Sequence, residues 1–176
     1  HLSIEILDEH GAACPVGTEG EVWFRQPGFL VYKDDPEKTA AATRGDLMTL
    51  GDIGYVDEDG YLFLCDRRAD VIVTGGVNVY PAQIEAVLLG HPAVADCCVI
   101  GAPDDEWGER IVAVVQPAPG VAVDPAALLA FAAAHLGRVQ VPRQVDVVDQ
   151  LPRTETGKLA RRAVRTPYWV TRERRI

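Results

Sequence analysis

Three short segments combine residue types that can bind or activate a ligand, and the first is centred on Asp52. Residues 49–55 read TLGDIGY, so glycines flank Asp52 on both sides and predict a tight turn. A carboxylate presented on that turn can accept hydrogen bonds from the hydroxyl pair of a sugar. The same Gly-Asp step is also common in turns that bind nothing, and the pattern alone leaves both interpretations open.

The second segment contains adjacent glycines, and the third presents a lysine on a polar loop. Gly75 and Gly76 lie in DRRADVIVTGGVNVYP, where they predict a hairpin that lets a ligand approach the backbone closely. Lys158 lies in LPRTETGKLARR, where an extended ammonium group can neutralise phosphate or carboxylate oxygens. An ordinary glycine turn and a solvated surface lysine are the alternatives. Neither GxGxxG nor a P-loop is present.

The elements that must position these residues change in character near residues 66–70. The first part is β-rich, with predicted strands at 2–7, 19–25 and on both sides of an Asp59-Gly60 turn, and a short helix at 36–43. The second part alternates predicted strands at 94–103, 110–118 and 144–151 with helices at 81–89, 123–136 and 157–165. We therefore expect an α+β fold in two pieces, residues 1–66 and residues 67–176.

Bulk composition disfavours nucleic-acid and membrane partners. The chain has 176 residues and a net charge of 17 − 26 = −9, so its surface repels a phosphate backbone. No run approaches the roughly 20 apolar residues of a membrane-spanning helix. His1 is not followed by a signal-peptide pattern, and we interpret the chain as a piece of a longer cytoplasmic protein.

The cysteines and histidines show no metal-binding spacing, so we predict no metal site. Adjacent Cys97 and Cys98 should point to opposite faces of a strand. We interpret all four cysteines as buried free thiols in a reducing compartment.

Taken together and in order, these segments resemble the adenylate-forming superfamily, and most of all its acyl-CoA synthetases. Four stretches carry the resemblance: TLGDIGYVDEDGYL, DRRADVIVTGGVNVYPAQIE, GAPDDEWGERIVAVV and LPRTETGKLARR. The resemblance covers essentially the whole chain. It implies that residues 1–66 end a large N-terminal domain in a distorted β-barrel. It also implies that residues 67–176 form a small mobile lid, a mixed three-stranded sheet with helices.

The resemblance implies a two-step reaction with ATP, Mg²⁺, a small carboxylate and CoA as ligands. Asp52 and Arg67 would bind the nucleotide, and Lys158 would contact the reacting carboxylate and α-phosphate. The Gly75-Gly76 hairpin would line the path of the CoA pantetheine, with Trp107 as a further CoA contact. Between the steps the lid would rotate on a hinge at the position of Ala69.

Two positions depart from the family pattern, and two parts of the active site lie upstream of this chain. The hinge position, often Asp or Lys in the family, is Ala69, and the run GRVQVP lacks the usual aromatic and lysine residues before Pro142. The phosphate loop and the acyl pocket are not in these residues, so the isolated piece should be inactive. Two alternatives stay open: an adenylation domain that loads a carrier protein, and a non-catalytic nucleotide- or CoA-binding module.

Overall fold

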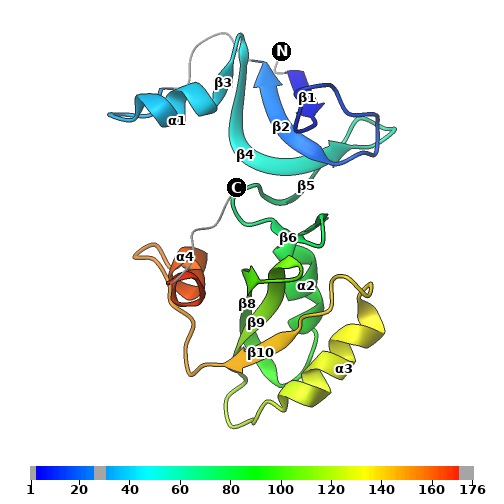
Figure 1. Ribbon diagram of the computed structural model, residues 1–176, viewed down its shortest axis with the longest axis vertical. Helices are drawn as coiled ribbons and strands as arrows, with labels where there is room; N and C mark the ends of the chain where they lie inside the picture. The colour runs from blue at the N-terminus through cyan, green and yellow to red at the C-terminus, as the bar shows by residue number, and fades with distance from the viewer. Residues whose placement is uncertain (1–2, 26–30, 171–176) are drawn as a thin grey trace. The chain divides into compact units, whose positions relative to one another are not determined.

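The computed structural model describes residues 3–25 and 31–170, and the chain divides into two compact units, residues 1–69 and residues 70–176 (Figure 1). The division falls between Ala69 and Asp70, three residues after the boundary that the sequence pattern suggests. Each unit has its own sheet, so the mixed α+β class is confirmed.

The first unit is built on an antiparallel five-stranded sheet with the strand order β1-β2-β4-β3, in which β5 also pairs with β4. Its strands are β1 (Ser3–Leu7), β2 (Gly20–Arg25), β3 (Thr43–Arg44), β4 (Leu47–Val56) and β5 (Leu62–Arg67). Leu7, Trp23 and Leu47 form its small buried cluster. Helix α1 (Pro36–Ala41) begins where Asp35 accepts a hydrogen bond from the Lys38 amide and proline takes the first helical turn, as predicted.

The second unit contains a five-stranded mixed sheet, so the expectation of three strands is wrong. Its order is β10-β9-β6-β7, with β8 also paired to β9. The strands are β6 (Ile72–Thr74), β7 (Val77–Val79), β8 (Val94–Asp104), β9 (Gly108–Pro117) and β10 (Gln144–Val147). The three-stranded sheet was implied by the family resemblance alone, and the hairpin that the sequence predicts around Gly75-Gly76 adds β6 and β7 to the same sheet.

The long β8–β9 hairpin lies between helices on both faces of the sheet (Figure 1). Helices α2 (Pro81–Leu88) and α3 (Pro125–His135) pack on one face, over the cluster that includes Cys97, Val99 and Ile111. Helix α4 (Arg161–Arg165) packs on the other face, over the cluster that includes Cys98 and Ile100. The predicted opposite orientation of the two adjacent cysteines is therefore confirmed.

The polypeptide after β10 differs most from the predicted elements. Strand β10 ends at Val147 rather than 151, and α4 begins at Arg161 rather than 157. Between them, Leu151 is fully buried and its amide donates to the Gln116 side chain. A 3-10 helix, η1 (Thr166–Trp169), follows α4. Lys158 therefore lies in a turn that precedes the helix. None of the described helices has the length and hydropathy of a membrane-spanning segment.

Candidate functional site

Asp52 and Arg67 face each other across the β4–β5 ladder of the first unit. They are cross-strand partners, and Arg67 Nε lies 2.7 Å from Asp52 Oδ1. The Asp52 side chain is 17% exposed, while that of Arg67 is 63% exposed. A carboxylate has acceptor capacity for several hydrogen bonds, so this one can bind further donors while Arg67 orients it.

A β-bulge produces this pairing. Gly54 pairs with Leu64, so an unbroken ladder would place Asp66 opposite Asp52, with like charges facing each other. The register instead shifts by one residue between Ile53 and Gly54, and Arg67 takes that place. Gly54 permits the close approach, because a Cβ there would lie 2.4 Å from the Phe63 carbonyl oxygen. The predicted turn at Asp52 is wrong, since the residue lies within β4.

Gly75 and Trp107 are brought together in the second unit, at the tip of the β6–β7 hairpin. The Gly75 amide donates to the Trp107 carbonyl at 2.8 Å. Gly75 has φ +57°, and a Cβ there would lie 2.6 Å from Trp107 Cε3, so both conformation and space require glycine. Gly76 has φ +79° and no atom within 4 Å of the position of a Cβ. A ligand can therefore approach the backbone at Gly76.

The turn before β9 presents the Trp107 ring. The Asp104 carboxylate accepts hydrogen bonds from the amides of Glu106 and Trp107, each at 3.0 Å. The bond from Trp107 is the main cause that lowers the pKa of Asp104 below its ordinary value. Arg143 lies over the indole with its guanidinium carbon 4.6 Å from the ring centroid.

Sequence reasoning missed Arg143, because it considered only the residues before Pro142 as basic contacts. Its backbone amide donates to the Ile111 carbonyl at 2.9 Å, just before β10 runs parallel to β9. The signal in the sequence was a basic residue immediately after the proline. The pair of Arg143 and Trp107 offers a flat aromatic surface and a cation to an anionic ligand with a heterocyclic ring.

Lys158 is exposed, and its turn is held by hydrogen bonds. The Thr154 amide donates to the Lys158 carbonyl at 2.8 Å, and the Lys158 amide donates to Thr154 Oγ1 at 3.2 Å. Arg153 donates to the Gly157 carbonyl at 2.8 Å and also pairs with Asp96 on β8. The Lys158 ammonium makes no ion pair within the described residues. The turn therefore presents a cation on a fixed backbone.

Arg161 anchors the segment after Lys158 to the body of the second unit. Its guanidinium donates to both carboxylate oxygens of Glu85 on α2, at 2.5 and 3.0 Å, and to the Val99 carbonyl at 2.6 Å. Asp70 Oδ2 lies 3.4 Å from Arg161 Nε. Burial alone would lower the pKa of Arg161, but the hydrogen bonds and charge of Glu85 raise it above its ordinary value.

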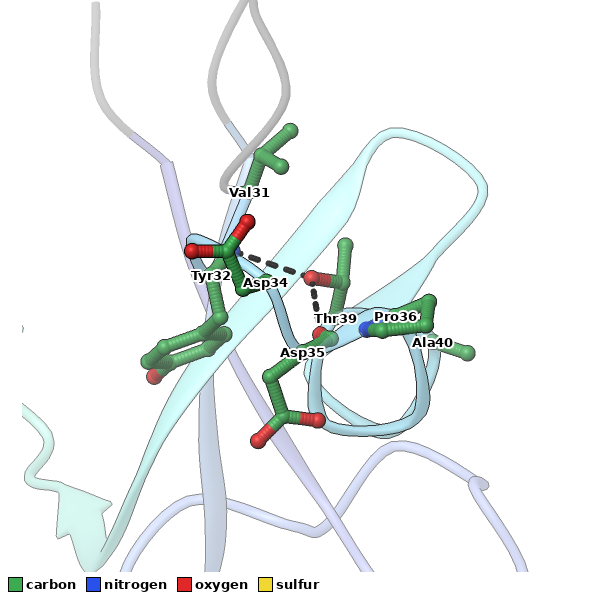
Figure 2. A pocket seen from close by; sticks show the side chains of 7 residues that line it. All are labelled: Val31, Tyr32, Asp34, Asp35, Pro36, Thr39 and Ala40. Atoms are coloured by element: carbon green, nitrogen blue, oxygen red, sulfur yellow. Dashed lines mark hydrogen bonds between the residues drawn. The ribbon is translucent and has the colours of Figure 1, made fainter.

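A shallow cavity of about 410 Å³ lies beside α1 and does not involve the predicted site residues (Figure 2). Its lining comes from residues 31–40, with Tyr32 and Thr39 among them. The Thr39 hydroxyl accepts from the Tyr32 amide and donates to the Asp35 carbonyl, as the dashed lines in Figure 2 show. These hydrogen bonds hold the backbone at Tyr32 and Asp35 against Thr39 of α1.

The remaining reactive groups include four free cysteines. Cys97 and Cys98 are buried, and burial raises the pKa of each thiol to about 12. Cys14 and Cys65 are partly exposed, so the expectation of burial is wrong for these two. In the part of the chain that the structure describes, no group of three or more His, Cys, Asp or Glu residues is placed to hold a metal ion.

The predicted site residues thus fall into separate groups. Asp52 and Arg67 form one group in the first unit, and Ala69 is the last residue of that unit. Gly75, Gly76 and Trp107 form a second group around the β6–β7 hairpin. Lys158 stands on a different turn of the second unit.

Comparison with known proteins relates this chain to a family of enzymes. Residues 83–158 match the AMP-binding enzyme C-terminal domain, and Lys158 is the last matched residue. The chain is 42% identical over 173 residues to a fatty acid–[acyl-carrier-protein] ligase, ScoC, from Streptomyces coeruleorubidus, covering 98% of this chain and 33% of that one. It is 44% identical over 156 residues to a 2-succinylbenzoate–CoA ligase of Geobacillus sp. (strain WCH70), covering 88% and 32%.

Two solved structures are similar to this chain over almost its whole length. The amide bond synthetase McbA from Marinactinospora thermotolerans superposes with a TM-score of 0.84 at 41% identity, covering 96% of this chain and 35% of that one. ATP-bound MatB from Rhodopseudomonas palustris superposes with a TM-score of 0.86 at 35% identity, covering 95% and 34%. The chain spans about a third of the length of the curated relatives it matches. The chain therefore belongs to the adenylate-forming ligase family and carries its AMP-binding enzyme C-terminal domain.

Proposed function

We propose that this chain is the C-terminal part of an AMP-forming acid–thiol ligase that makes an acyl-CoA from a carboxylate, ATP and CoA. The observation that carries the proposal furthest is the Lys158 turn, which holds its backbone by hydrogen bonds and leaves the ammonium without an ion pair among the described residues. The relatives that align over 88–98% of this chain are ligases for carboxylic acids by name, which supports the same assignment.

In the first step, a carboxylate oxygen attacks the α-phosphorus of ATP. The bond from that phosphorus to the bridging oxygen breaks, and diphosphate leaves. Lys158 neutralises the charge that the carboxylate and α-phosphate oxygens share in the transition state. The Asp52 carboxylate, oriented by Arg67, accepts hydrogen bonds from the ribose hydroxyls of the nucleotide.

In the second step, the sulfur of CoA attacks the acyl carbon of the acyl-adenylate. The bond from that carbon to the phosphate oxygen breaks, AMP leaves, and the thiol proton passes to solvent. The open space at Gly76 provides a path for the pantetheine, and Trp107 with Arg143 suits the ring and phosphates of the nucleotide part of CoA. A rotation of the second unit about Ala69 brings Lys158 into use in the first step and the Gly75-Gly76 hairpin into use in the second.

The isolated chain does not perform this reaction, because residues for binding the ATP phosphates and the acyl group belong to an upstream part of the protein. Mg²⁺ would be bound with ATP and would neutralise phosphate charge; no group of three or more His, Cys, Asp or Glu among the described residues is placed to hold it. The identity of the carboxylate is decided by that upstream part.

One observation favours a carrier protein, instead of free CoA, as the acceptor of the acyl group. ScoC, at 42% identity over nearly the whole chain, is by name a ligase for an acyl carrier protein. In this alternative the same pantetheine path takes the phosphopantetheine arm of a carrier protein.

The test is to assay the full-length protein against a panel of carboxylates for diphosphate release. Free CoA and a phosphopantetheine-bearing carrier protein are then supplied separately to the best substrate. The proposal expects AMP and acyl-CoA to form together in equal amounts. Diphosphate release without either thioester, or no diphosphate release with any carboxylate, would contradict it.

A further inference from the structure

Glu109 is a buried carboxylate that has no role in the chemistry described above. It is 7% exposed and lies on β9, two residues after Trp107. A buried carboxylate is costly unless hydrogen bonds hold it, so its position in the sheet needs a physical reason. Its surroundings connect it to the Gly75-Gly76 hairpin.

The backbone pairing between β6 and β9 ends next to Glu109. Thr74 and Gly108 are the pair that joins these two strands, and the next antiparallel pair would be Val73 opposite Glu109. There the Val73 amide donates to Glu109 Oε2 at 3.3 Å. The side chain of Glu109 thus supplies an acceptor to β6 at the point where the backbone ladder stops.

Gly101 on β8 makes room for this carboxylate. A Cβ at Gly101 would lie 2.1 Å from Glu109 Oε2 and 2.9 Å from its Cδ. The φ angle of Gly101 is outside the left-handed region, so space rather than conformation is the reason for glycine here. The carboxylate and the glycine form one packed unit beneath β6.

The hairpin above is attached to the rest of the unit mainly at its base, where Ile72 and Val79 are buried in the core cluster. Strands β6 and β7 have three residues each, and the Gly75 amide bonds to the Trp107 carbonyl at the tip. Nearer the tip, the side chains of Val73 and Val77 are about half exposed and add less burial. The position of the hairpin therefore depends strongly on the contacts at its base.

We propose that Glu109 is a positioning residue that packs against Gly101. Its carboxylate holds the Gly75-Gly76 hairpin in the position that leaves a path for the pantetheine of the thiol acceptor. The expected effect on the CoA step rests on the proposed function, whereas the effect on the position of the hairpin does not. Loss of the carboxylate frees β6 to shift, and a shift of about 1 Å at a substrate path can cost about 10²-fold in rate.

The experiment uses the full-length protein and measures the two half-reactions separately. Glu109→Ala should lower kcat/KM for CoA, with supplied acyl-adenylate, by about 10²-fold, mainly through KM. Exchange of diphosphate into ATP should change less than about threefold, because adenylation does not use the hairpin. Gly101→Ala should act in the same direction as Glu109→Ala, since its methyl group displaces the carboxylate. Glu106→Ala, at an exposed glutamate of the neighbouring turn, is the matched control and should leave both steps unchanged.

Two further measurements separate positioning from general destabilisation. Glu109→Gln retains an acceptor oxygen and the shape of the side chain, so it should recover most of the CoA step. Hydrogen exchange of the Val73 amide should accelerate in Glu109→Ala and in Gly101→Ala, while the amides of β8 stay protected.

Equal loss of both half-reactions in Glu109→Gln and Gly101→Ala would overturn the proposal, as would unchanged exchange at Val73. If the wild-type protein forms no thioester, the proposed function fails instead. The Val73 exchange measurement then still decides whether Glu109 holds the hairpin.

Discussion

Removal of the Arg161 guanidinium should destabilise the second unit strongly, and Arg161→Met is the appropriate variant. Methionine keeps much of the buried stem of arginine but removes every hydrogen-bond donor of its side chain. The Arg161 and Glu85 side chains are only 17% and 14% exposed, so little solvent screens the pair. After the substitution, the Glu85 carboxylate keeps its bond from the Val99 amide at 2.7 Å and loses its counter-charge.

The magnitude follows from the contacts. Arg161 makes two hydrogen bonds to Glu85 and one to the Val99 carbonyl. Hydrogen bonds to charged groups contribute about 1.5–3 kcal/mol each, though not additively. Breaking a buried pair from one side costs about 3–5 kcal/mol in total. We expect Arg161→Met to lower the free energy of unfolding by about 4 kcal/mol.

Urea unfolding of the chain measures this loss. A Trp23→Phe background leaves Trp107 and Trp169, both in the second unit, as the fluorescent reporters. With a slope of about 1–3 kcal/mol per molar urea, the midpoint should fall by more than about 1 M. The double variant Glu85→Gln, Arg161→Met removes the Glu85 charge that Arg161 balances and should recover about half of the loss. A loss below about 1 kcal/mol, or strictly additive effects, would refute the reasoning.

Three further predictions follow from single features of the chain. Gly75→Ala adds a methyl group 2.6 Å from Trp107, whereas the methyl group of Gly157→Ala meets no atom within 4 Å. Both glycines have positive φ, so thermal unfolding should show a loss of unfolding free energy that is larger for Gly75→Ala by about 1–3 kcal/mol. Equal losses in the two variants would contradict this. The pKa of about 12 for Cys97 and Cys98 exceeds the unfolded value of 9.0, so the stability that these thiols contribute is present below pH 9.0 and is lost as pH rises to about 12. Alkylation of both thiols at pH 8 should therefore follow global unfolding, and fast labelling of the folded protein would be the opposite result. The isolated chain should show no exchange of diphosphate into ATP with any carboxylate, and measurable exchange would overturn the assignment of the upstream residues.

Local signals in the sequence predict the elements that depend on neighbouring residues. The β4–β5 connection is one case, because Asp57 accepts from the amides of Asp59 and Tyr61 while Gly60 takes φ +84°. The two cysteines on β8 are another, because alternation along a strand determines which face each one joins. In both cases the physical cause spans only a few residues.

Long-range geometry determines what the sequence pattern could not predict. Asp52 meets Arg67 only because a bulge shifts the register by one residue, and no local pattern indicates the bulge. Arg161 and Glu85 are 76 residues apart, and packing of α4 and α2 against β8 brings them together. The contact of Gly75 with Trp107 likewise depends on the short β6–β9 pairing. Such contacts follow from tertiary structure rather than from residue spacing.

In the proposed function, the second unit uses Lys158 in one half-reaction and the Gly75-Gly76 hairpin in the other. The most direct measurement compares both half-reactions of the full-length protein in Lys158→Ala and Gly76→Trp. Removing one preorganised cation costs on the order of 10²–10³ in rate, so Lys158→Ala should slow adenylation by that much and thioester formation from supplied acyl-adenylate only a few-fold. Gly76→Trp fills the open space at the hairpin tip and should do the reverse. Equal loss of both steps in Lys158→Ala would contradict the account.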